Sequence, residues 1–116
     1  MYPLLTLGQQ AINEQPMYGG QAKTKEMLAI DQEFIATALQ KSGTREAAAQ
    51  YYTNLGWHYL SGGNPQTAIK RFNQAWLLDS TVADTYFGFS AYLRQQEKTE
   101  EAERFMTVAR KHDRNN

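Results

Sequence analysis

Hydrophobic side chains recur at intervals of three and four residues from Thr24 onward, the spacing that places them on one face of an α-helix. The first such run carries charged and amide residues on its opposite side. Its apolar members are Met27, Ile30, Phe34, Ile35, Ala38 and Leu39. Thr24 is a suitable N-cap and Ser42-Gly43 a suitable end, so the pattern predicts a helix between them.

The same pattern predicts four more helices, each preceded by a residue whose side chain can accept a hydrogen bond from the first turn. These helices and their caps are Thr44 before Arg45 to about Ser61, Asn64 before Pro65 to about Leu78, Asp79 or Ser80 before a helix through Gln96, and Thr99 before Glu100 to about Lys111. Short turns between helices favour antiparallel neighbours. The predicted fold class is therefore all-α, an antiparallel helical array without a sheet.

The first 23 residues follow no sustained helical period, because proline and glycine interrupt them repeatedly. Their apolar side chains are nevertheless numerous for a solvated tail: Tyr2, Leu4, Leu5, Leu7, Ile12, Met17 and Tyr18. We expect an arm over residues 1–23 that packs along the helices of its own chain or of a neighbour, with a disordered leader as the alternative. The helical domain then spans residues 24–116.

One set of positions recurs about 34 residues further along the chain with its chemical character unchanged. The first set is Tyr52, Leu55, Gly56, Tyr59, Ala68, Phe72 and Ala75, and the second is Tyr86, Phe89, Ser90, Leu93, Ala102, Met106 and Ala109. Small residues recur where two helices must approach closely, and large apolar ones recur beside them. Gly56 and Ala68 are the clearest examples of the small class.

This recurrence resembles the tetratricopeptide repeat family, whose unit is a helix-turn-helix of about 34 residues. The resemblance covers roughly residues 49–116, as repeats of about 49–82 and 83–116, and the chain is similar to bacterial members. It implies that the recurring positions form the packing contacts within and between helix pairs. The helix starting after Thr24 would cap the front of the array.

In this family the first helix of each repeat lines a concave groove that receives a peptide. The groove positions carried over to the first unit are Gln50, Thr53, Asn54, Trp57, Leu60 and Ser61, and those of the second are Asp84, Phe87, Gly88, Ala91, Arg94 and Gln95. Thr53, Asn54, Trp57, Leu60, Phe87 and Arg94 are the predicted binding residues. Trp57 and Phe87 are large where internal packing does not require them, as expected of interface anchors. The alternative is that the arm or the helix at residues 27–34 covers both.

Two other features were interpreted from the pattern alone. Asn73 and Gln74 lie in the predicted third helix and are expected to be simple surface amides. Phe105 and Val108 have no following helix to cover them, and the arm residues Tyr2 to Leu7 also need a surface. A homodimer that buries one of these apolar sets follows as an expectation.

Composition and motifs limit the kinds of function expected of this chain. Twelve basic and twelve acidic residues cancel, so no strong field favours nucleic acid, and no apolar run suggests direct membrane insertion. No cysteine is present, and His58 and His112 are not at metal-ligand spacing. No enzyme, cofactor or metal site is predicted. The start of the chain leaves the compartment unknown: cytoplasmic as the sequence is written, or periplasmic if a signal or lipoprotein leader was removed.

The function expected from the resemblance is a non-catalytic scaffold that binds a peptide or protein segment in the concave groove. The alternative is a structural element that homo-oligomerises within a larger bacterial envelope or secretion complex. The identity of the partner does not follow from these residues.

Overall fold

The computed structural model describes residues 12–113, and in this part of the chain the protein consists of helices without a β-strand. The elements are the 3-10 helix η1 (Pro16–Gly20) and the α-helices α2 (Lys25–Ser42), α3 (Arg45–Ser61), α4 (Pro65–Leu78), α5 (Ala83–Gln95) and α6 (Thr99–His112). The predicted all-α class is confirmed.

The first three α-helices begin where capping chemistry predicts. The side chain of Thr24 accepts a hydrogen bond from Met27 N–H at 3.1 Å, and that of Thr44 accepts one from Ala47 N–H at 3.0 Å. Asn64 does the same for the helix that starts with proline. Each cap satisfies a backbone donor that lacks a partner within its helix, which explains why these boundaries were predictable.

The last two helices begin differently from the prediction. α5 starts at Ala83 after Val82, which makes no side-chain cap, so Asp79 and Ser80 are not its caps. The Asp79 carboxylate instead accepts hydrogen bonds from the backbone N–H and the hydroxyl of Thr81, at 2.9 and 2.6 Å, and this turn delays the helix. α6 includes Thr99 as its first residue rather than its cap.

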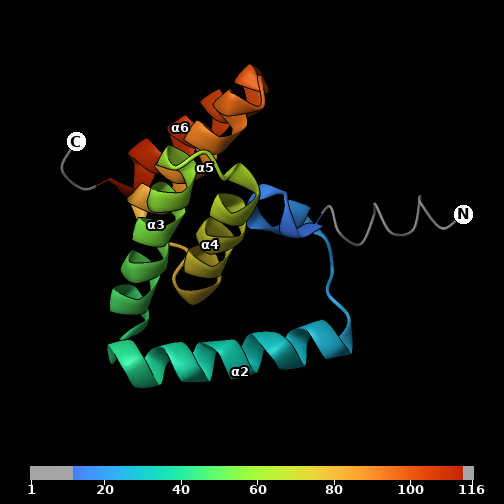
Figure 1. The fold of residues 1–116 in the computed structure, drawn as a ribbon, viewed down its shortest axis with the longest axis vertical. Helices are drawn as coiled ribbons and strands as arrows, with labels where there is room; N and C mark the ends of the chain where they lie inside the picture. The colour runs from blue at the N-terminus through green and yellow to red at the C-terminus, as the bar shows by residue number, and fades with distance from the viewer. Residues whose placement is uncertain (1–11, 114–116) are drawn as a thin grey trace, which may run out of the picture.

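The helices form two adjacent hairpins crossed by α2. α3 runs beside α4, α5 runs beside α6, and α2 lies across the end where α3 begins (Figure 1). Arg45 joins the start of α3 to the end of α4, because its Nε donates to Leu78 O at 2.6 Å and its Nη2 to Leu77 O at 3.1 Å. These bonds satisfy carbonyls that the end of a helix leaves free.

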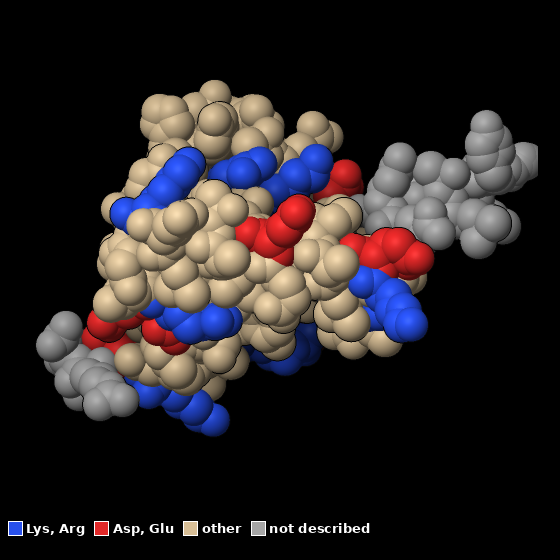
Figure 2. All heavy atoms as spheres, turned by 90° about the horizontal axis from the view of Figure 1, so that it is seen from below, with Lys and Arg blue, Asp and Glu red and all other residues tan. Residues whose placement is uncertain are grey.

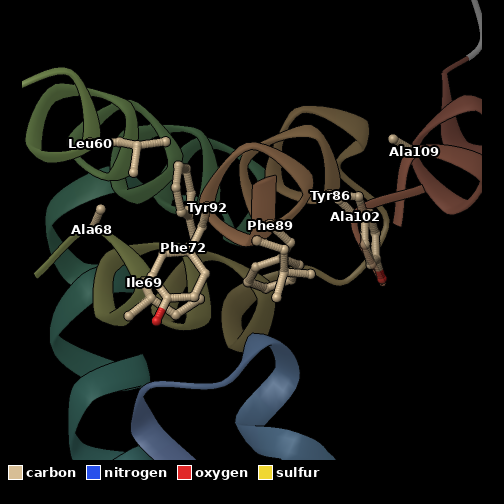
Figure 3. Packing of buried hydrophobic residues seen from close by; sticks show 10 residues of the cluster. Leu60, Ala68, Ile69, Phe72, Tyr86, Phe89, Tyr92, Ala102 and Ala109 are labelled. Atoms are coloured by element: carbon tan, nitrogen blue, oxygen red, sulfur yellow. The ribbon is translucent and has the colours of Figure 1, made fainter. Parts of the chain in front are cut away.

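Phe72 lies at the centre of the core and is fully buried (Figure 3). Its ring packs edge-on against Phe89, with centroids 6.3 Å apart. A Cβ atom added to Gly56 in α3 or to Gly88 in α5 would fall on this same ring. Gly56 therefore permits the close helix contact that the sequence predicts. Gly88, expected in the groove, is buried and packs against the core instead.

The other recurring positions differ in how deeply their side chains are buried. Ala68, Ala75, Phe89, Ala102 and Ala109 have no exposed surface, and Tyr86 has very little. Tyr52, Leu55, Tyr59 and Met106 are half-buried. Tyr52 packs edge-on against Phe34 of α2, with centroids 5.0 Å apart, so α2 covers this end of α3.

The described part of the arm packs on α4 and α5 of its own chain. Ile12, Pro16 and Tyr18 are buried there. The side chain of Asn73, which is 1% exposed, accepts a hydrogen bond from Met17 N–H at 2.8 Å. It donates to two arm carbonyls, and Tyr92 Oη donates to a third. The expected packing is thus observed for residues 12–18, whereas residues 19–22 are exposed and Tyr2, Leu4, Leu5 and Leu7 lie outside the described residues. Asn73 is not the surface amide that was expected.

The C-terminal helix covers its own apolar residues to a large extent. Phe105 packs against Phe89 and Tyr86, at centroid distances of 5.4 and 6.4 Å, and Val108 lies against the same core. The basis for expecting dimerisation through Phe105 is therefore weakened. Large exposed apolar side chains occur instead in α2, where Leu28 is 50% and Ile30 65% exposed.

Candidate functional site

An apolar hollow of about 350 Å³ lies where α3, α5 and α6 meet. It is lined by Trp57, Phe87, Ser90, Ala91, Arg94, Gln95 and Met106. Trp57 and Phe87 contribute aromatic surface from two different helices, and both are half-buried. The hollow thus joins three of the predicted binding residues, Trp57, Phe87 and Arg94, in one place.

Two contacts fix the orientation of Trp57. Its indole Nε1 donates to Asp84 Oδ1 at 3.1 Å, and its ring packs edge-on against Phe72 with centroids 5.5 Å apart. The first contact joins α3 to α5, and the second joins Trp57 to the core. A side chain held in this way loses little rotamer freedom when a ligand contacts its free face.

The polar residues around the hollow form weak surface pairs. Arg94 Nη2 lies 3.1 Å from Glu103 Oε2, and both side chains are largely exposed. Asn54, also exposed, is not among the described lining residues; it accepts a hydrogen bond from Gln50 Nε2 at 3.1 Å. Exposed pairs of this kind contribute about 0–1 kcal/mol, so a ligand can replace them at little cost.

Two predicted binding residues have no accessible surface for a ligand. Thr53 is fully buried, and its hydroxyl shares a 2.7 Å hydrogen bond with the hydroxyl of Thr85 between α3 and α5. Leu60 is 5% exposed and belongs to the core around Phe72. Both residues pack inside the helical core and do not line the hollow. They are removed from the set of candidate contact residues.

The hollow also includes residues with a double role. Ser90 and Met106 were interpreted only as repeat packing, yet both line it. The Ser90 hydroxyl donates to Ala102 O at 2.8 Å, so it is already committed to the α5–α6 contact. Their position at the inner edge of α5 and α6 follows from the helix pairing, which the sequence pattern alone does not place in space.

Neither the described part of the arm nor α2 contributes to the lining of this hollow. The arm lies on α4 and α5 through Asn73 and Tyr92, and α2 crosses the opposite end of α3. Within residues 12–113, Trp57 and Phe87 are therefore not covered in the way the alternative interpretation required.

Three tyrosines are buried deeply enough for their pKa to change. Burial raises the pKa of Tyr18, Tyr86 and Tyr92. The His112 ring stacks on the Tyr86 ring with centroids 5.0 Å apart, and no group of three or more His, Asp and Glu residues in residues 12–113 could hold a metal ion.

Acidic and basic residues are interspersed on the face shown in Figure 2. None of the described helices is long and apolar enough to cross a membrane.

Comparison of the chain with protein-family models, with curated proteins and with solved structures finds no match.

Proposed function

We propose that the α3–α4 and α5–α6 hairpins are two tetratricopeptide-like repeats. Support comes from the burial of residues at equivalent positions. Ala68 and Ala102 are both fully buried, as are Ala75 and Ala109. Gly56 and Ser90, the small residues of the two first helices, are buried as well. Equal burial at equal spacing is what a repeated helix pair requires.

Phe72 and Met106 occupy equivalent positions in the two repeats but differ in burial, and this difference affects the hollow. Phe72 is fully buried because α3 and α5 both pack on it, whereas Met106 is half-buried and faces the hollow. α6 is the last helix that the structure describes. Met106 therefore adds a flexible apolar side chain to the hollow, and methionine adapts readily to differently shaped partners.

We propose that the protein is a non-catalytic interaction module that binds a peptide or protein segment along α3 and α5. The observation that carries this proposal is the apolar hollow between Trp57 and Phe87, with an oriented indole on one side. Aromatic side chains of this kind are typical binding anchors. The apolar lining suits a large apolar side chain, such as leucine, phenylalanine or methionine, within an otherwise polar peptide.

The polar groups of the hollow support binding rather than catalysis. Ser90, its one lining hydroxyl, donates to a backbone carbonyl, and no histidine or carboxylate is among the described lining residues. A serine nucleophile would require an adjacent general base. No cofactor is proposed for the same site.

Selection from a displayed random-peptide library tests the proposal. Enriched peptides should share an apolar anchor residue, and their affinity should fall about tenfold or more for Trp57→Ala and for Phe87→Ala. Tyr51→Ala is the matched control, because Tyr51 is 55% exposed and lies outside the hollow. Selected peptides that bind all three variants as tightly as the parent protein would contradict the proposed groove.

A second candidate function is self-assembly, favoured by the exposed apolar residues Leu28 and Ile30 of α2. Sedimentation at increasing concentration tests it. Self-association should be reduced by Ile30→Glu, and a parent protein that stays monomeric throughout would exclude assembly through α2.

A further inference from the structure

A second cavity, of about 260 Å³, lies between α2, α4 and the arm, away from the α3–α5 hollow. Its apolar wall includes Met27 and Phe34 of α2, Leu77 of α4 and Tyr18 of the arm. The cavity therefore suits a small ligand rather than a folded partner.

One ion pair of the cavity is already satisfied. Lys23 Nζ lies 2.6 Å from Asp31 Oδ2, with only 9% and 17% of the two side chains exposed. The same ammonium lies 3.4 Å from the centre of the Tyr18 ring. These contacts connect the arm to α2 and balance the two charges against each other. The pair forms part of the cavity wall.

The remaining charge in the cavity lining is positive. Lys70 and Arg71 both line it, and the described lining contains no second carboxylate beside Asp31. Arg71 Nη1 donates to Gln74 Oε1 at 2.7 Å. Arg71 Nε, in contrast, is buried, and no acceptor from residues 12–113 reaches it. A buried donor without an acceptor is unfavourable, so this N–H favours a ligand that brings an oxygen.

We propose that this cavity binds an apolar carboxylate of the size of a medium-chain fatty acid. The carboxylate is balanced by Lys70 and draws the Arg71 guanidinium toward it, so that Nε–H gains an acceptor, while the alkyl chain packs against Met27, Phe34 and Leu77. Charge complementarity selects the carboxylate, because guanidinium groups form their strongest hydrogen bonds with carboxylate-type acceptors. The apolar wall of the cavity favours a ligand that carries an alkyl chain. This site is separate from the proposed peptide groove.

Calorimetric titration of the full chain with octanoate tests this assignment. Octanoate should bind with a dissociation constant of about 1 mM or tighter, and octanol, which has the same chain without the charge, about tenfold more weakly. In a ¹H–¹⁵N spectrum, octanoate should shift the Arg71 Nε–H resonance. Arg71→Gln should weaken octanoate binding about tenfold. Arg104→Gln, on exposed α6 surface, is the control and should not change it.

The comparison of octanoate with octanol uses the unmodified protein and so does not depend on how well Arg71→Gln folds. Equal affinity for the two ligands would show that the charge plays no part. Octanoate binding that leaves the Arg71 resonance unmoved would place the ligand elsewhere, for example beside the exposed Leu28 of α2. Either result would overturn the proposal, as would the absence of octanoate binding.

Discussion

The side chain of Asn73 accepts a hydrogen bond from the backbone N–H of Met17 at 2.8 Å, although 56 positions separate the two residues in the chain. Its amide also donates to the carbonyls of Asn13 and Gln15, at 3.1 and 2.9 Å. One buried side chain thereby satisfies three backbone groups of an irregular segment. This segment includes Met17 and Tyr18 at φ 57°, a conformation that non-glycine residues adopt only when neighbouring contacts compensate.

Asn73→Leu should release the arm. The substitution preserves size but removes Asn73 as a partner of Met17 N–H and of the Asn13 and Gln15 carbonyls, although Tyr18 N–H still donates to Gln15 O at 3.0 Å. We expect a loss of about 2 kcal/mol in the free energy of unfolding. Amide hydrogen exchange at Met17 should accelerate as well. Gln66→Leu, at the exposed start of the same helix, is the control. Unchanged exchange at Met17 would mean that apolar burial alone holds the arm.

A methyl group at Gly56 or Gly88 should destabilise the fold, because either Cβ would collide with the Phe72 ring. Gly56→Ala and Gly88→Ala should each reduce the free energy of unfolding by about 1–3 kcal/mol in urea. Combining either with Phe72→Leu should give a smaller loss than the sum of the single changes. Strict additivity would show that Phe72 is not the residue in contact.

The buried hydroxyl pair of Thr53 and Thr85 allows a double-mutant cycle. Thr53→Val should destabilise the protein by about 1–3 kcal/mol, because it leaves the Thr85 hydroxyl buried without its partner. The double variant with Thr85→Val should recover much of this loss. Thermal or urea unfolding of the four proteins measures the coupling. A double variant with a lower free energy of unfolding than both single variants would contradict a simple pairwise hydrogen bond.

The ionisation of Tyr18 should make stability fall at alkaline pH. Burial, with a smaller contribution from nearby Asp31, raises the pKa of Tyr18 well above its usual range. The folded state then retains a proton that the unfolded chain loses above about pH 10, so unfolding becomes more favourable as the pH rises beyond that point. Urea unfolding from about pH 9 to about pH 11 should show a steeper loss for the parent protein than for Tyr18→Phe. Identical slopes would exclude this contribution.

The parts of the fold that follow from local chemistry could be predicted from the sequence. Thr24, Thr44 and Asn64 cap helices at their own positions, so their side chains are enough to define the start. Asp79 could not be assigned in this way, because its carboxylate has a competing local partner in Thr81. Capping a helix and accepting hydrogen bonds from Thr81 would both satisfy the Asp79 carboxylate, and the sequence does not distinguish the two arrangements.

The site required information that the pattern along one helix lacks. Trp57 and Phe87 were identified because they are large at positions where helix packing does not need them. Thr53 and Leu60 share that helix face by spacing, but the α3–α5 contact and the core bury them. The three bonds of Asn73 were likewise invisible, since a polar residue in a helix is usually exposed unless a distant segment supplies its partners.

The indole N–H resonances of the two tryptophans offer the most direct test of the proposed groove. Trp57 Nε1 donates to Asp84 at the hollow, while Trp76 Nε1 donates to Tyr86 Oη at 3.1 Å on another part of the molecule. A library-selected peptide titrated into ¹⁵N-labelled protein should shift the Trp57 resonance progressively and leave that of Trp76 in place. A peptide that binds without shifting the Trp57 indole resonance would contradict the proposed groove.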